Sequence, residues 1–120
     1  MSKTTLVLGA SANPSRYSNI AINRLRSNNH PVVAIGKRNG TVGDTPVETT
    51  TRNIENLDTV TLYLNPNNQK PYYQYIIDLK PKRIIFNPGT ENNELAEIAK
   101  KEGIQSLEAC TLVLLSTGQY

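Results

Sequence analysis

Apolar residues recur along this chain in two patterns, short continuous runs and longer segments with helical spacing. The first run, residues 5–8, is rich in branched side chains and ends abruptly at Gly9. A polar loop follows, and residues 19–26 then carry isoleucine, alanine and leucine at positions that suit a packed helix. A strand, a glycine turn and a helix are the first unit of a nucleotide-binding α/β domain, so we predict such a unit here.

Further runs and spacings predict the remaining elements. Strands are predicted at residues 31–35, 59–64, 83–86 and 104–107. Helices are predicted at residues 52–57, from Tyr72 to Leu79, and after Thr90, whose side chain suits an N-cap. The glycine-punctuated stretch 36–47 predicts no regular element, and the last apolar run, 112–115, fits a strand and a helix equally well.

Strands that alternate with helices predict an α/β fold, in which helices cover both faces of a parallel sheet. We predict a single Rossmann-like, doubly wound domain over residues 1–120, with a mostly parallel five-stranded sheet in the order 3-2-1-4-5. The carboxyl ends of its strands would share one edge, where the turn-rich loops after the first four strands would meet. We therefore expect the functional site at that edge.

Composition narrows the classes of function. A chain of 120 residues can form one core that needs no disulfide or metal. The single cysteine, Cys110, excludes an internal disulfide and fits a reducing, cytoplasmic setting, and we expect neither a signal peptide nor a membrane span. With one histidine, His30, the chain also lacks the ligands of a usual zinc site. The net charge of +3 is too small to indicate nucleic-acid binding by itself.

The end of the second predicted strand carries the most informative charges. NAD-binding domains of this class place an acidic residue there, which accepts hydrogen bonds from the ribose hydroxyls. This chain has Gly36-Lys37-Arg38 instead, and its next carboxylate is Asp44. Two cations attract a ribose phosphate, which NADP carries on its 2′ oxygen and coenzyme A on its 3′ oxygen. The sequence therefore favours one of these two cofactors.

Four motifs follow one another in order: Gly9-Ala10-Ser11-x-x-Pro14-x-Arg16-x-Ser18, Val42-Gly43-x-x-Pro46-Val47, Pro66, and Asn87-Pro88-Gly89. Together they resemble the small stand-alone CoA-binding proteins, whose fold is similar to the CoA-binding domain of succinyl-CoA synthetase. The resemblance covers nearly the whole chain. It implies a Rossmann-like domain that binds coenzyme A or an acyl-CoA, usually without catalysis of its own.

The resemblance also implies roles for individual residues. The backbone of residues 9–11, with Arg16 and Ser18, would hold the pyrophosphate, and Lys37 would lie near the ribose phosphate. Together with the charge argument for residues 36–38, this gives the full predicted set: Gly9, Ala10, Ser11, Pro14, Arg16, Ser18, Gly36, Lys37, Arg38, Pro66, Asn87, Pro88 and Gly89.

Non-catalytic binding of CoA or acyl-CoA is therefore the leading hypothesis. One alternative is a minimal NADP-dependent reductase, although the chain has no Tyr-x-x-x-Lys pair and no room for a substrate domain. Another is a CoA-binding subunit for a separate acyl-CoA ligase, and a homo-oligomer is also open. We predict no catalytic or metal-binding residue, no nucleic acid and no membrane. A disulfide between Cys110 and the CoA thiol is a further alternative.

Overall fold

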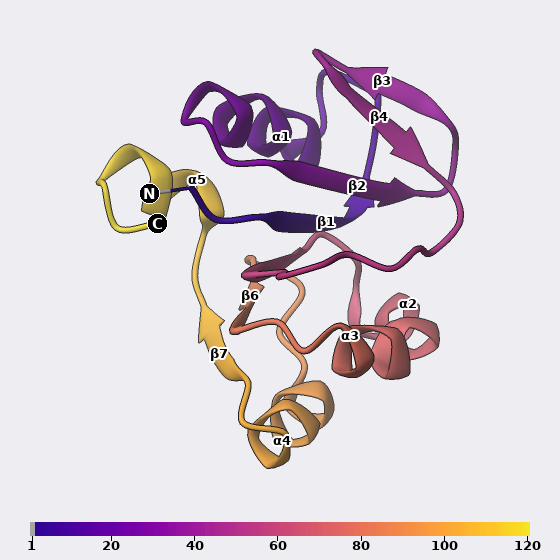
Figure 1. The fold of residues 1–120 in the computed structure, drawn as a ribbon, viewed down its shortest axis with the longest axis vertical. Coiled ribbons are helices and arrows are strands. Elements are labelled where there is room, and N and C mark those ends of the chain that lie inside the picture. The colour runs from indigo at the N-terminus through magenta and orange to yellow at the C-terminus, as the bar shows by residue number, and fades with distance from the viewer. Residues whose placement is uncertain (1) are drawn as a thin grey trace.

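The strands of this protein form one seven-stranded sheet, seen in a computed structural model that describes residues 2–120 (Figure 1). They are β1 (Thr5–Ala10), β2 (Val32–Gly36), β3 (Gly40–Val42), β4 (Thr45–Glu48), β5 (Thr59–Leu62), β6 (Arg83–Phe86) and β7 (Gln105–Glu108). Their order across the sheet is β3-β4-β2-β1-β5-β6-β7. Every neighbouring pair is parallel except β3 and β4, which are antiparallel.

Helices cover both faces of this sheet, as the doubly wound prediction requires. They are α1 (Tyr17–Ser27), α2 (Pro66–Gln69), the 3₁₀ turn η1 (Lys70–Tyr72), α3 (Tyr73–Leu79), α4 (Asn93–Lys101) and α5 (Thr111–Ser116). One core joins α3 and α4 to one face of the sheet, and a second core joins α1 and α5 to the other (Figure 1). No helix within residues 2–120 has the length and apolar character needed to cross a membrane.

The central strand β1 shows why residues 6–8 are all apolar. Leu6 and Leu8 point into the core beneath α3 and α4, and Val7 points into the core beneath α1. All three side chains are fully buried. Because consecutive side chains of a strand point to opposite faces, a strand covered on both sides needs an unbroken apolar run.

The predicted five strands and their order 3-2-1-4-5 are wrong. The glycine-punctuated stretch after β2 forms the β3–β4 hairpin, and β4 takes the position beside β2 that the prediction gave to residues 59–64. The chain then crosses back, and β5 pairs with the opposite side of β1, where Leu8 lies beside Leu62. The predicted third strand is therefore a neighbour of the first strand and not of the second.

Three smaller predictions are also settled. Residues 52–57 contain no helix, although Ile54 and Leu57 reach the core as expected. Thr90 is not the N-cap of α4, because the side chain of Asn92 accepts the hydrogen bond from the backbone amide of Leu95 at 3.2 Å. The apolar run at residues 112–115, left open between strand and helix, lies in α5.

At the amino-terminal edge of the sheet, His30 and Tyr120 join several strands. The backbone amide of Lys3 donates to Nδ1 of His30 at 2.9 Å, and the His30 and Tyr120 rings lie 4.9 Å apart. The Arg83 guanidinium lies over the Tyr120 ring, 4.5 Å from its centre, and donates to the Tyr120 carbonyl oxygen. Since a protonated Nδ1 cannot accept a hydrogen bond, this arrangement requires a neutral His30.

We expect this requirement to make folding stability depend on pH. Burial, followed by the positive charge of Lys3, lowers the pKa of His30 below its ordinary value of 6.5. The folded state thus binds this proton more weakly than the unfolded state. Neutral His30 therefore stabilises the folded state above pH 6.5, and this stabilisation is lost as the pH falls below 6.5. Melting temperatures measured between pH 7.5 and 5 should fall more steeply for the wild type than for His30→Gln. Equal slopes would show that His30 does not contribute.

Candidate functional site

The turn after β1 is shaped by the packing of its backbone against the segment that follows β5. Gly9 has a φ of +91°, and a Cβ atom built on it would lie 2.8 Å from the carbonyl carbon of Tyr63. Both facts require glycine, because other residues rarely adopt this φ and no space exists for a side chain. The glycine therefore sets how closely β1 and the segment after β5 approach at the carboxyl edge.

The loop between β1 and α1 is held by its own polar side chains. Oδ1 of Asn13 accepts from the Ser15 amide at 3.0 Å, and Oγ of Ser11 accepts from the Asn13 amide at 3.1 Å. The amide of Asn19 reaches back from α1 to the Ser11 carbonyl at 3.0 Å. No side chain caps the amino end of α1, so its first amides retain the partial positive charge of a helix start.

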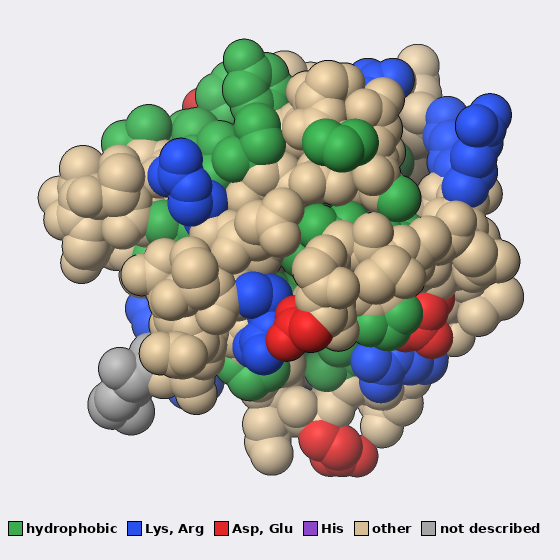
Figure 2. Space-filling view, turned by 90° about the horizontal axis from the view of Figure 1, so that it is seen from above, with side chains coloured by type: hydrophobic (Ala, Val, Ile, Leu, Met, Phe, Trp, Pro, Cys, Tyr) green, Lys and Arg blue, Asp and Glu red, His purple; other side chains and the backbone are tan. Residues whose placement is uncertain are grey.

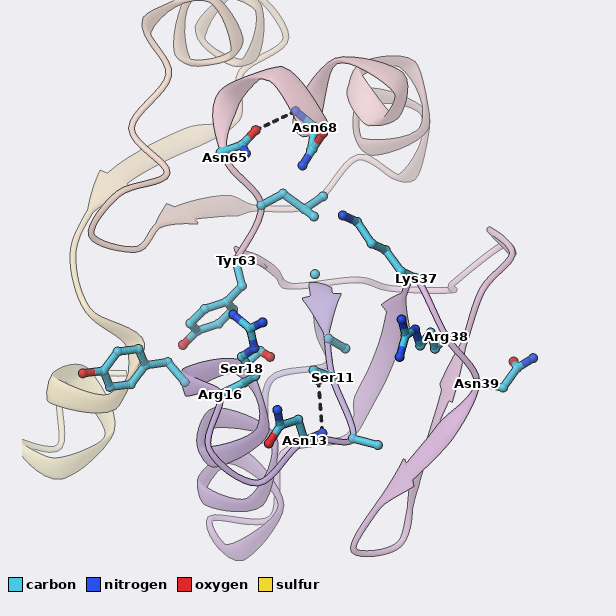
Figure 3. A pocket seen from close by; sticks show the side chains of 15 residues that line it. Ser11, Asn13, Arg16, Ser18, Lys37, Arg38, Asn39, Tyr63, Asn65 and Asn68 are labelled. Carbon is cyan, nitrogen blue, oxygen red and sulfur yellow. Dashed lines mark hydrogen bonds between the residues drawn. The ribbon is translucent and has the colours of Figure 1, made fainter.

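A groove of about 690 Å³ opens between this loop and the segments that follow β2 and β5 (Figure 3). Such a volume lies within the range of small-molecule sites in proteins. We call it the carboxyl-edge groove. Its lining residues are Gly9, Ala10, Ser11, Ala12, Asn13, Arg16, Tyr17, Ser18, Lys37, Arg38, Asn39, Tyr63, Leu64, Asn65 and Asn68.

The charged side chains that line this groove all carry the same sign. They are Arg16, Lys37 and Arg38, and no carboxylate joins them. Within residues 2–120, none of the three forms an ion pair or a side-chain hydrogen bond. Unpaired cations around a concave surface concentrate positive potential there, which suits an anionic ligand.

Two arginines outside the groove are neutralised by carboxylates. Arg26 pairs with Asp44 at 2.8 Å, and Arg52 pairs with Glu48 at 3.0 Å. Figure 2 looks down on the molecule from above the view of Figure 1, and on that face the lysines and arginines form several separate groups with hydrophobic side chains between them. The three cations of the groove are thus distinguished by their convergence on one hollow rather than by the total charge.

The two ends of the groove differ in chemistry. Lys37, Arg38 and Asn39 lie at the end beside β2, whereas Tyr63 and Arg16 lie at the opposite end, toward α5 (Figure 3). Tyr17, the first residue of α1, is 72% exposed, which is unusual for a large aromatic side chain. The end beside β2 is therefore basic, whereas the opposite end, which we call the aromatic end, combines the rings of Tyr63 and Tyr17 with the Arg16 guanidinium.

The structure brings some of the predicted site residues together and places others elsewhere. Those in the groove lining are Gly9, Ala10, Ser11, Arg16, Ser18, Lys37 and Arg38. Those outside the lining are Pro14, Gly36, Pro66, Asn87, Pro88 and Gly89. Loops after β1 and β2 thus meet in this groove, whereas the loop after β6 does not line it.

The side chain of Asn87 is committed to the fold. Its amide donates to Oγ1 of Thr61 at 2.7 Å and to the carbonyl of Leu62 at 2.8 Å, and its Oδ1 accepts from the Thr111 amide at 2.9 Å. Asn87 is 3% exposed. It therefore ties β5 and β6 to the start of α5 and leaves no side-chain group free for a ligand.

The groove also contains residues that the sequence did not single out. Tyr17, Asn13, Asn39, Asn65 and Asn68 belong to the loops or helix starts that follow β1, β2 and β5. Their positions directly after predicted strands were the sequence signal that could have identified them as groove residues. Tyr63 was hidden because residues 59–64 were predicted as one continuous strand, whereas β5 ends at Leu62.

Comparison with known proteins agrees with this architecture. Residues 3–116 match the family model described as CoA binding domain. A search of curated protein sequences finds no significant match.

Solved structures agree as well. A crystal structure of an uncharacterized protein is 48% identical, with a TM-score of 0.97 over 100% of this chain and 99% of its own. A hypothetical protein from Pyrococcus horikoshii OT3 is 21% identical, with a TM-score of 0.87 over 97% of this chain and 83% of its own. A Thermus thermophilus protein is 18% identical, with a TM-score of 0.83 over 99% of this chain and 91% of its own. The last two likenesses show the fold alone.

Proposed function

Because this chain belongs to the CoA-binding domain family, we propose that it binds coenzyme A or an acyl-CoA in the carboxyl-edge groove, without chemistry of its own. The observation that carries this proposal is the convergence of Arg16, Lys37 and Arg38, unpaired and with no carboxylate in the lining. CoA is an anion with phosphates at two separate places. A groove with cations at two separate places is complementary to it.

The positions of the cations suggest how the ligand lies. Arg16 stands at the start of α1, beside the backbone of the loop after β1, and this is where we place the pyrophosphate. Lys37 and Arg38 follow β2, and we assign them to the 3′-phosphate of the ribose. The pantetheine arm then extends toward Tyr63, with Pro66 and residues 87–89 beyond the groove as its further neighbours.

A binding role without catalysis fits the residues of the groove. No histidine, cysteine, aspartate or glutamate is among the lining residues, so the lining holds no ordinary general base near neutral pH. Its polar groups are amides, hydroxyls and cations, which bind and orient an anion.

Thermal denaturation in the presence of candidate ligands tests the proposal. A ligand at a hundredfold excess over its Kd stabilises the folded state by about 2.7 kcal/mol, so CoA should raise the melting temperature by several degrees. NAD, which carries no phosphate on the 2′ or 3′ oxygen of its adenosine ribose, should give no shift at the same concentration. A shift with NADPH and none with CoA would instead support the reductase alternative.

A further inference from the structure

One buried polar atom of this protein stands out. Among residues 2–120, the Tyr63 hydroxyl is the buried side-chain atom that has no hydrogen-bond partner. The Tyr63 ring forms part of the groove wall, at the aromatic end (Figure 3). Buried polar groups in folded proteins are nearly always hydrogen-bonded, so an unpartnered hydroxyl at the wall of a ligand groove calls for an explanation.

The neighbours of this hydroxyl are already engaged with one another. Thr61 and Thr111 lie close enough to the phenol to lower its pKa, yet neither makes a hydrogen bond of acceptable geometry with the Tyr63 hydroxyl, and their own hydroxyls hydrogen-bond to each other at 2.8 Å. The Thr61 oxygen also accepts from the Asn87 amide at 2.7 Å. Burial raises the pKa of Tyr63 to about 12, so the phenol keeps its proton and remains a donor at neutral pH.

Other tyrosines of the chain contrast with Tyr63. The hydroxyl of Tyr75 donates to the Arg52 carbonyl at 2.5 Å, and that of Tyr73 donates to Oε1 of Glu94 at 3.0 Å. These two hydroxyls have partners although both are more exposed to water. Tyr63 is thus the tyrosine whose hydroxyl is both withdrawn from water and unpaired.

We propose that the Tyr63 hydroxyl is the hydrogen-bond donor for a carbonyl oxygen of the CoA arm, and that it gains this partner only when the ligand is bound. The inference rests on the proposed function. In CoA the pyrophosphate lies between the ribose and the arm, so with the 3′-phosphate at Lys37 and the pyrophosphate at Arg16 we place the arm beyond Arg16, beside Tyr63, where its two amides and any thioester supply carbonyl acceptors. Tyr63 follows the end of β5, and its ring points toward α5 (Figure 3), so ligand binding must include a change of the Tyr63 rotamer that turns the hydroxyl toward the groove.

The phenylalanine variant tests this inference through two effects of opposite sign. In the free protein, Tyr63→Phe removes an unpaired buried hydroxyl, so the melting temperature should stay equal or rise by up to about 5 °C. In the complex, the same change removes a hydrogen bond, so the affinity for CoA should fall about threefold to tenfold. A purely structural tyrosine would not produce this pair of effects.

A ligand that keeps the phosphates but lacks the arm separates the two contributions to affinity. Adenosine 3′-phosphate 5′-diphosphate is the nucleotide half of CoA and lacks the arm. Calorimetric titration with this nucleotide and with CoA should show that the wild type and Tyr63→Phe bind the nucleotide with the same affinity. Tyr75→Phe is the matched control, because it removes a satisfied hydroxyl outside the groove. This control should lower the melting temperature and leave both affinities unchanged.

The outcomes separate the two proposals. If the wild type binds neither ligand, the proposed function has failed and this inference fails with it. If the wild type binds both ligands and Tyr63→Phe binds CoA equally well, the proposed function stands and the role of Tyr63 is overturned. Equal loss of both affinities in Tyr63→Phe would likewise overturn it, because the effect would not concern the arm.

Discussion

A Gly36→Ala variant is expected to lose about 3–5 kcal/mol of folding stability, more than overpacking usually costs. Gly36 ends β2, and a Cβ atom built there would lie 2.1 Å from the carbonyl oxygen of Ala10 and 3.3 Å from Val47. Neither neighbour can retreat easily, because β1, β2 and β4 pair side by side. Adding one methyl group should therefore force the ends of β1 and β2 apart.

Thermal denaturation followed by circular dichroism measures this loss. A natural control is Gly89→Ala, because Gly89 has a φ of +91° but open space where a Cβ atom would lie. That control should cost about 1–2 kcal/mol, the usual penalty of a left-handed backbone for a residue with a side chain. Equal losses in the two variants would show that the close approach of Gly36 to Ala10 is not what demands glycine there.

The second large effect concerns the basic end of the groove. If Lys37 and Arg38 hold the 3′-phosphate, the wild type should bind CoA about tenfold more tightly than dephospho-CoA, which lacks that phosphate. Charge-assisted hydrogen bonds contribute roughly 1.5–3 kcal/mol, and solvent exposure favours the lower end. The variant Lys37→Ala/Arg38→Ala should then lose affinity for CoA and keep that for dephospho-CoA, so that the difference between the ligands disappears.

Titration calorimetry of both proteins with both ligands completes this cycle. Lys80→Ala/Lys82→Ala is the matched control, because it removes the same charge from a hollow at the amino-terminal edge, away from the groove. It should leave the preference for CoA intact. If the Lys37/Arg38 variant weakens both ligands equally, these cations act through the general field of the protein and the assignment to the 3′-phosphate is wrong.

Strands near the centre of the sheet could be predicted because each contains a short segment rich in buried apolar and branched residues. Residues 83–86, for example, are buried along their whole length and were predicted with their observed bounds. The β3–β4 hairpin gave no such signal. Its strands are three and four residues long and alternate buried residues such as Val42 with exposed ones such as Pro46. Strand order depends on this unpredicted hairpin, so the order was wrong although most strands were right.

The candidate site could also be predicted in part. Parallel strands bring their carboxyl ends to one edge, so the cations Arg16, Lys37 and Arg38 could be expected near one another from sequence alone. What local sequence could not show is the direction of a side chain within a loop. Asn87 lies directly after β6, yet its amide turns inward to Thr61 and the start of α5. That orientation depends on α5, which is the segment whose structure the sequence left undecided.

The central place of β1 has a consequence for the growing chain during synthesis. Once β2 has emerged from the ribosome, α1 can cover the Val7 side of β1, because all three elements lie within the first 36 residues. The opposite side, with Leu6 and Leu8, is covered by α3 and α4, and Ile76 of α3 lies 68 residues after Leu8. At roughly 5–20 residues per second, that interval lasts several seconds. Throughout it, the nascent chain presents an uncovered apolar strand face that a chaperone can bind.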